Sequence, residues 1–426
     1  MSLSPQSAVA EGYSPKVEKL TTPGGIKVWL TEEHAIPLIA FRFAFKGGAL
    51  QDPDGRTGLT QTMTSLLGEG AGDLDSSAFA REMADIGAKL DFSTARDQVY
   101  GGLDVLPKHL EKASQLVRLA LSAPRFDQDA IDRVKAQSLA DLEMMEGNPR
   151  SEVFHNWYKT TFPAQRYGRR TKGTSDSVRA ITRDELVKQH KRLIARDVLR
   201  VVVVGDITAD AVKTAVDKLF AELPEKATLD EVAPAKMKHV AEVQVLEQNQ
   251  PLATAAFGGT SVPPGDPDFA AMEIINQILG SGDFNSILMD EIRVKRGLAY
   301  SVSLSTIDDS VASIVLGGMS TKNENMMPAL DVLKKSLAKF NEQGPTQAQF
   351  DNARKYLTGS YLLDFDTNSK LASSLLTLWI EGRQPEYIGR RNAEIDAVKI
   401  DDMKRVGHRV LDPEKINISV VGKLPK

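Results

Sequence analysis

The 426-residue sequence contains no cysteine and only six histidines. The absence of cysteine excludes disulfide bridges, thiolate nucleophiles and thiolate metal sites. No charge of one sign predominates, because 53 Lys and Arg residues face 57 Asp and Glu residues, for a net charge of −4. Without a basic run, the chain is not expected to bind nucleic acid. No apolar run approaches the roughly 20 residues that cross a bilayer, so no membrane span is expected.

What the sequence does contain is an internal duplication. The segment PLIAFRFAFKGGALQDPDGRTGLTQTMTSLLGEG, which begins at Pro37, resembles PLATAAFGGTSVPPGDPDFAAMEIINQILGSG, which begins at Pro251. The segment ITRDELVKQHKRLIARDVLRVVVVGD from Ile181 likewise resembles VKIDDMKRVGHRVLDPEKINISVVGK from Val398. The two offsets, 214 and 217 residues, are nearly equal, so the similarity keeps its order across most of each half. Such a repeat predicts two homologous domains.

The length agrees with two domains, because a single core stops growing beyond about 250 to 300 residues. The segment LPEKATLDEVAPAK at 223–236 is rich in charge and carries two prolines, which is typical of an exposed linker. We therefore predict a first domain over 1–225, a linker over 226–236 and a second domain over 237–426.

Periodicity and turn residues predict the elements of the first half. In chain order these are strands at 26–30 and 38–45, helices at 59–67 and 77–86, paired strands at 88–95 and 98–106, several helices between 110 and 194, and a buried strand at 199–206. Early strands, central helices and one returning strand indicate an α+β fold, with a mixed, mainly antiparallel sheet and helices packed on one face. Two such domains are expected to form a clam-like cleft, where a ligand would bind.

The segment GRTGLTQTMTSLLGEG at 55–70 resembles the surroundings of a zinc-binding helix. A helix that carries H-x-x-E-H directs two histidines to one zinc ion, and its glutamate activates a water molecule. In its surroundings and its duplication, the chain is similar to the pitrilysin family of zinc peptidases. That family includes insulin-degrading enzymes, mitochondrial processing peptidases and core proteins of the respiratory cytochrome bc complex.

The resemblance places Gln61, Thr64 and Ser65 where the family has histidine, glutamate and histidine. A neutral amide is a poor zinc ligand, and a threonine hydroxyl is no general base at neutral pH. The family's third ligand, a glutamate, would fall near Asp141, and one carboxylate cannot hold a catalytic zinc ion. No two histidines have metal-ligand spacing on one predicted helix. We expect no metal or other cofactor in this chain, and no peptidase activity from the chain alone.

The second half contains GSGDFNSILMDEIRVKRGLAYSVSLST, which resembles the family's SRLFxxLREKxGLAYSV segment. The resemblance implies that Arg293 and Tyr300 project into the cleft. A tyrosine hydroxyl can stabilise the negative charge that develops on a scissile carbonyl, and arginine offers a planar fork for a carbonyl or carboxylate. From spacing alone, Arg293 could instead form a surface ion pair and Tyr300 could pack in the core. Arg296 is a competing candidate, because it also lies close to the break at Gly297.

In the family, the strand that follows the zinc helix pairs with the main chain of the substrate. The segment LDFSTARDQ occupies that place, so Asp91, Phe92, Ser93 and Thr94 are candidate peptide-binding residues. An ordinary solvated strand explains the same segment equally well.

Two functions remain open at this point. The resemblance implies a noncatalytic subunit of a heterodimeric peptidase, which binds peptide and supplies Arg293 and Tyr300 to a partner that carries H-x-x-E-H and zinc. The alternative is a structural or peptide-binding core-type protein with no part in hydrolysis. The triplet Ala8-Val9-Ala10 has the small-residue pattern that precedes signal cleavage, which favours the periplasm over the cytoplasm.

Overall fold

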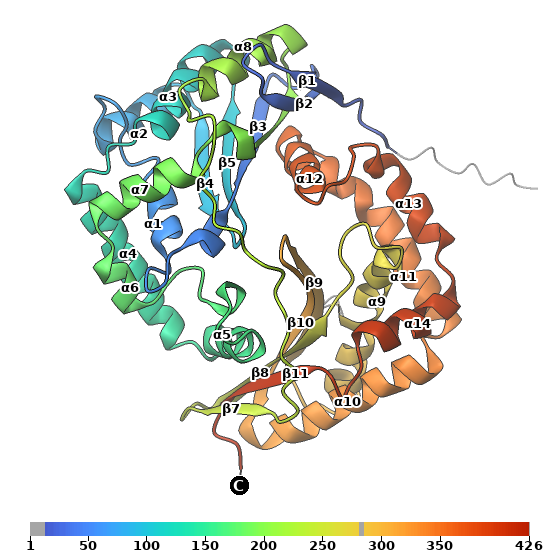
Figure 1. The fold of residues 1–426 in the computed structure, drawn as a ribbon. Coiled ribbons are helices and arrows are strands. Elements are labelled where there is room, and N and C mark those ends of the chain that lie inside the picture. Colours follow the sequence, from blue (N-terminus) through green and yellow to red (C-terminus); the bar gives the residue numbers. More distant parts are fainter. Residues whose placement is uncertain (1–12, 281–284, 426) are drawn as a thin grey trace, which may run out of the picture.

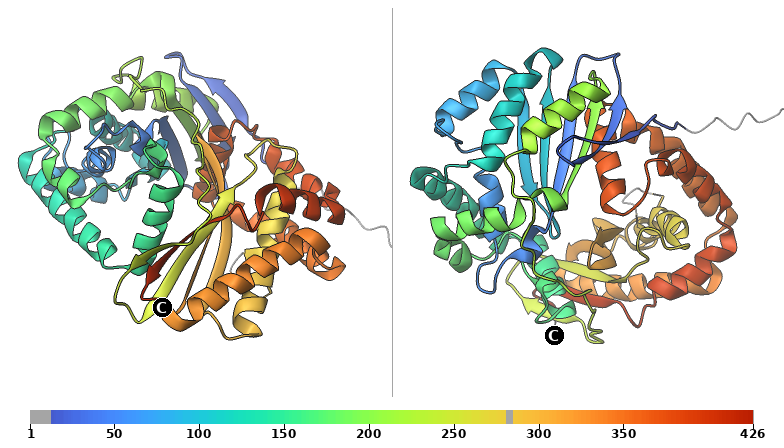
Figure 2. Two further views of the ribbon diagram at one scale, coloured as in Figure 1. Left: turned by 60° about the horizontal axis from the view of Figure 1, so that its bottom comes forward. Right: turned by 45° about the horizontal axis from the view of Figure 1, so that its top comes forward.

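The computed structural model describes residues 13–280 and 285–425, and Figure 1 shows two α+β domains side by side. The triplet at 8–10 and a short part of the segment quoted before Arg293 lie outside the described residues. The views in Figure 2 show the same two halves from other directions. This architecture confirms the predicted α+β class and the two domains.

The first sheet has the strand order β1-β2-β6-β3-β5-β4. Its strands are β1 (Glu18–Thr21), β2 (Lys27–Glu32), β3 (Ile39–Lys46), β4 (Lys89–Thr94), β5 (Gln98–Val105) and β6 (Leu199–Gly205). Among the described strands of this sheet, β2 and β6 pair in parallel and the other pairs are antiparallel. Strands β2 to β6 therefore lie where the alternating and buried segments predict them, whereas β1 was not predicted.

The second sheet, with the order β7-β11-β8-β10-β9, repeats this arrangement without a counterpart of β1 among its described strands. Its strands are β7 (Gln244–Glu247), β8 (Leu252–Thr260), β9 (Ser301–Asp309), β10 (Ala312–Lys322) and β11 (Asn417–Gly422). Here the pair β7 and β11 is parallel, and the remaining described pairs are antiparallel. One edge of the first sheet is β4, and the equivalent edge of the second sheet is β9.

The helices of each half cover one face of its own sheet (Figure 1). In the first half these are α1 (Leu59–Ser65), α2 (Ser76–Asp85), α3 (Leu110–Ser122), α4 (Gln128–Glu146), α6 (Ser175–Ala180), α7 (Arg183–Leu193) and α8 (Ala209–Phe220). In the second half they are α9 (Phe269–Gly280), α10 (Met326–Gln343), α11 (Gln347–Ser360), α13 (Tyr387–Ala397) and α14 (Ile400–Val410). A separate hydrophobic core forms under each set.

Two further helices cross from one half to the other. Helix α5 (Pro149–Thr161) of the first half packs on the second sheet, where the fully buried Trp157 donates from Nε1 to the carbonyl of Asn417 (3.0 Å). Helix α12 (Asn368–Ile380) of the second half packs on the first sheet, and Trp379 stacks on Trp29 with ring centroids 4.6 Å apart. Each sheet thus gains cover on its other face from the opposite half, a feature that local periodicity does not reveal.

The segment between the halves is largely exposed, but its backbone is anchored at several points. The N–H of Thr228 donates to the carbonyl of Arg192 (2.9 Å), and the N–H of Ala235 donates to the carbonyl of Val311 (2.8 Å). Because these contacts reach both halves, this connection is attached to the surface rather than a loose tether. No helix in the described ranges has the length and apolar character needed to cross a membrane.

Candidate functional site

The loop before α1 is organised by a buried carboxylate. Asp52 is 1% exposed and accepts hydrogen bonds from the backbone N–H of Gly58 (2.8 Å) and from the N–H and hydroxyl of Thr60 (2.9 and 2.5 Å). It therefore caps the N-terminus of α1, whose orphan amides need acceptors. Burial raises the pKa of Asp52 to about 6, against the opposing effect of these hydrogen bonds. Sequence reasoning missed this residue, because the capping signal is an acid or hydroxyl residue immediately before a helix, and Asp52 lies six residues before the N-cap, Gly58.

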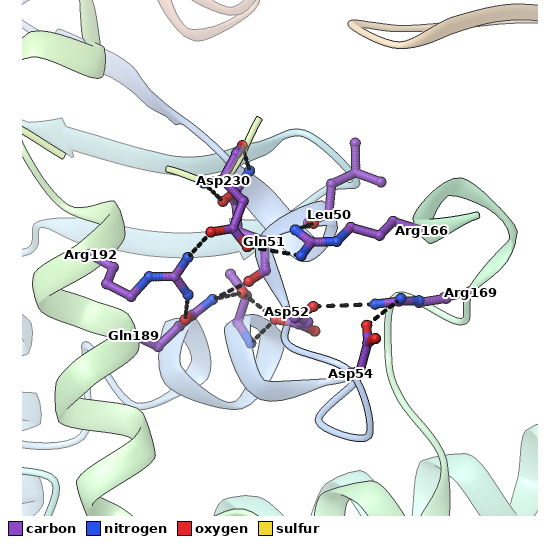
Figure 3. Close-up of polar contacts among 10 residues, drawn as sticks. Leu50, Gln51, Asp52, Asp54, Arg166, Arg169, Gln189, Arg192 and Asp230 are labelled. Atoms are coloured by element: carbon purple, nitrogen blue, oxygen red, sulfur yellow. Dashed lines mark hydrogen bonds and ion pairs between the residues drawn. The ribbon is translucent and has the colours of Figure 1, made fainter. Parts of the chain in front are cut away.

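Arginines surround the same loop, as Figure 3 shows. Arg166 donates to the carbonyl of Leu50 (3.0 Å), and the guanidinium groups of Arg166 and Arg192 both reach the carboxylate of Asp230 (2.9 and 3.1 Å). Arg166 and Arg192 hold the pKa of Asp230 below its ordinary value. Asp230 belongs to the connecting segment, so this network fixes the start of α1 and the path between the halves together.

The three altered motif positions lie on α1, where none is equipped to bind zinc. Gln61 is half-buried, and its Nε2 donates to the exposed hydroxyl of Ser65 one turn later (3.3 Å). Thr64 is buried, and its hydroxyl accepts from that of Thr94 on β4 (2.8 Å). Asp141 lies on α4, where its carboxylate accepts from the side chain of Gln137. Thr64 thus connects helix α1 to the edge strand β4 through a hydrogen bond.

A search for groups of three or more His, Cys, Asp or Glu side chains that could hold a metal ion finds none in the described residues. The donor set at α1, an amide and two hydroxyls, also lacks the nitrogen and carboxylate ligands that zinc takes in peptidases. Zinc therefore does not fit this helix.

The candidate peptide-binding strand, β4, has two different faces. Asp91 and Ser93 are exposed, whereas Phe92 and Thr94 are half-buried. The ring of Phe92 packs edge-on against Phe43, with centroids 6.3 Å apart, and belongs to the border of the core. Among the described strands β4 pairs with β5 alone, so its outer edge is available to a further strand.

Arg293 and Tyr300 lie next to each other. The guanidinium carbon of Arg293 is 6.0 Å from the centroid of the Tyr300 ring, within the range of cation–π attraction. Tyr300 is 80% exposed, and its backbone N–H donates to the carbonyl of Ser320 (3.2 Å). The alternative that Tyr300 packs in the core is therefore wrong.

The competing arginine, Arg296, has a different environment. Its Nη1 contacts both a side-chain oxygen and the carbonyl oxygen of Glu291 (2.6 and 2.7 Å). Arg296 is thus tied to its own helix end, a short π-helical turn over Met289–Val294, while Arg293 projects beside the tyrosine.

Direct contacts between the halves cross the region where the cleft was expected. The hydroxyl of Tyr167 donates to the carboxylate of Asp309 (2.7 Å), and the N–H of Ser310 donates to that of Asp97 (2.7 Å). Beside them, a cavity of about 350 Å³ is lined by residues of both halves and of the connecting segment. Burial raises the pKa of Asp309 and of Tyr167. The lining of this cavity includes none of the predicted site residues.

Comparisons with known proteins give consistent results. Residues 27–175 match the sequence model of a family described as insulinase (peptidase family M16), and residues 180–357 match one described as peptidase M16 inactive domain. The non-peptidase homolog YmxG of Helicobacter pylori is 28% identical over 350 residues, which are 81% of this chain and 79% of that protein.

Two further similarities extend over nearly the whole chain. A probable mitochondrial-processing peptidase subunit beta from Arabidopsis thaliana is 24% identical over 432 residues, covering 96% of this chain and 79% of that protein. The crystal structure of a peptidase M16 inactive domain from Pseudomonas fluorescens has a TM-score of 0.91 and 24% identity, covering 96% of this chain and 98% of that one. This last likeness concerns the fold.

Proposed function

The chain belongs to peptidase family M16, the insulinase family, as an inactive-type member without the H-x-x-E-H motif, and on this premise we propose that it is the noncatalytic subunit of a heterodimeric peptidase. A partner of the same family supplies zinc, its histidines and the glutamate base. The observation that carries the proposal is the contrast between α1, which lacks every motif ligand, and the adjacent, exposed Arg293 and Tyr300.

In this proposal the arginine and tyrosine act on the substrate at the partner's site. The hydroxyl of Tyr300 donates a hydrogen bond to the scissile carbonyl oxygen as negative charge develops there. The guanidinium of Arg293 binds a neighbouring carbonyl or carboxylate with its planar fork. An exposed tyrosine gains strength as a donor when a second surface excludes water around it. The pair therefore works only after the partner covers it.

The same chain binds part of the peptide. The outer edge of β4 offers backbone groups to an extended substrate, and the exposed side chains of Asp91 and Ser93 flank that edge. Phe92 supports the strand from the core side. We place the assembly in the periplasm, on the sequence pattern at 8–10 alone.

The test is reconstitution. The purified full chain is assayed for zinc content and for cleavage of an extended fluorogenic peptide, first alone and then mixed with an H-x-x-E-H member of the family encoded beside it. We expect neither zinc nor activity alone, and activity on mixing. Inactivity of a mixture that forms a stable complex would contradict the proposal and favour the alternative, a structural or peptide-binding protein. Zinc-dependent activity of the lone chain would contradict both.

A further inference from the structure

The segment that carries Arg293 and Tyr300 is held from two sides. On the sheet side, the backbone N–H of Tyr300 donates to the carbonyl of Ser320 (3.2 Å), and the hydroxyl of Thr321 donates to the carbonyl of Leu298. These contacts attach the tyrosine end to β10. The arginine end is attached through a different group.

Glu291 holds the helical end of the segment. Its carboxylate accepts from Nζ of Lys295 (2.7 Å) and from Nη1 of Arg296 (2.6 Å), and its carbonyl oxygen accepts from the same Nη1 (2.7 Å). Lys295 and Arg296 are thereby folded back onto the helix. The chain then passes through Gly297, whose φ of 62° is a left-handed conformation that favours glycine. We call these contacts of Glu291 with Lys295 and Arg296 the clamp. The path of the chain from Arg293 to Tyr300 is fixed by the clamp at one end and by the hydrogen bonds to β10 at the other.

The clamp also pairs acidic with basic side chains in this segment. Residues 290–296 contain two acids and three bases, so their net charge is +1. Asp290 and Glu291 bind Lys295, and Glu291 binds Arg296, with N to O distances of 2.6 to 2.7 Å. Lys295 and Arg296 in turn hold the pKa of Glu291 below its ordinary value. Removal of the Glu291 charge would release Arg296, which could then compete with Arg293 for the substrate, whereas Lys295 would keep its contact with Asp290 (2.7 Å).

We propose that Glu291 is a positioning residue for the pair of Arg293 and Tyr300, and that it makes Arg293, rather than Arg296, the cation that meets the substrate. The inference rests on the proposed function for its effect on hydrolysis. The clamp itself is a property of the lone chain, so its structural part is measurable without a partner.

A double-mutant cycle in the reconstituted pair tests the clamp. Because Glu291→Gln and Arg296→Gln break the same contact, we expect each to lower kcat about tenfold with little change in KM, and the double variant to do no worse. Asp331→Asn is the matched control, because Asp331 forms an exposed ion pair with Lys335 one turn later on α10 (2.6 Å). Losses that add in the double variant, or an equal loss in the control, would overturn the inference.

Hydrogen exchange in the lone chain supplies the second readout. We expect the amides of 293–300 to exchange about tenfold faster in Glu291→Gln and Arg296→Gln, and at the native rate in Asp331→Asn. Unchanged exchange in the first two variants would overturn the clamp. If Tyr300→Phe lowers kcat and Glu291→Gln leaves it unchanged, the proposed function stands and this inference fails. If Tyr300→Phe also leaves kcat unchanged, the proposed function fails while the exchange result still decides the clamp.

Discussion

The two halves contain the same Asp-Pro-Asp sequence before their first long helix and use it differently. In the first half, Asp52 is buried and its carboxylate is met by uncharged donors of Gly58 and Thr60. In the second half, Asp266 and Asp268 form ion pairs with Arg409, each with a 2.7 Å contact. Burial raises the pKa of Asp52 to about 6, whereas Arg409 lowers that of Asp266. A duplicated sequence has therefore kept its place in the fold while its electrostatics have diverged.

A second pair of equivalent contacts has been kept in both halves. In the first half the hydroxyls of Thr64 and Thr94 join α1 to β4 (2.8 Å), and in the second half the side chain of Asn276 on α9 donates to the hydroxyl of Thr306 on β9 (2.5 Å). Both residues are shifted by 212 positions between the halves. Because α9 carries no counterpart of the zinc motif, this hydrogen bond serves the fold. Thr64 is thus explained by architecture, although it occupies the position of the family's glutamate.

The largest expected difference between the two halves concerns α5 and α12, the helices that pack on the sheet of the opposite half. Trp157 of α5 is fully buried and hydrogen-bonded, whereas its counterpart in the exchange, Trp379 of α12, is only half-buried. We expect Trp157→Ala to lower the free energy of unfolding by about 3–5 kcal/mol, and Trp379→Ala by about 1–2 kcal/mol. Urea denaturation measures both. Equal losses would mean that the two crossings contribute alike.

In the proposed function, Arg293 and Tyr300 give the second half a role that the first half does not have. Replacement of Tyr300 by Phe should lower kcat of the reconstituted pair by about 10²-fold, because the hydroxyl that meets the developing oxyanion is lost. The ring is exposed, so assembly and thermal stability should be unchanged. An unaltered kcat in a variant that still assembles would remove Tyr300 from the reaction.

The sequence predicted the fold better than it predicted individual contacts. Alternating and buried strands, and the duplicated order, depend on local pattern and were readable. The partners of α5 and α12 depend on how two finished halves dock, which no local period encodes. Of the four candidates on β4, Phe92 faces the core, because successive strand residues point to opposite sides. The nearness of Arg293 to Tyr300 was accessible only through the family resemblance, since seven residues and a turn separate them.

The pH dependence of stability should differ in sign between the two acidic loops. Asp52 has a folded pKa of about 6, above its ordinary 3.8, so the folded state binds more protons between these values and stability falls as pH rises through them. The lowered pKa of Asp266 acts oppositely: its stabilisation is present above the ordinary value and is lost as pH falls.

Asparagine variants test this contrast through the free energy of unfolding at pH 4.5 and pH 7. Asp52→Asn should lose less stability, relative to the native chain, at pH 7 than at pH 4.5, by on the order of 2 kcal/mol. Asp266→Asn should lose about the same stability at pH 4.5 and pH 7, because both lie above the ordinary pKa of 3.8, and should lose less in a further measurement at pH 3. Parallel pH profiles for the two variants would show that the loops do not differ electrostatically.

The smallest expected effect falls on the altered motif itself. Gln61 is half-buried, and its hydrogen bond to Ser65 within α1 is long (3.3 Å), so Gln61→Ala should change stability by about 0.5 kcal/mol or less. Hydrolysis by the reconstituted pair should be nearly unchanged, because in the proposed function the reacting groups come from the partner and from the second half. Ser65→Ala is the matched control, since it removes the other end of the same bond. A tenfold loss of kcat with either variant would mean that α1 of the first half, rather than Arg293 and Tyr300 of the second, makes this subunit's contribution to hydrolysis.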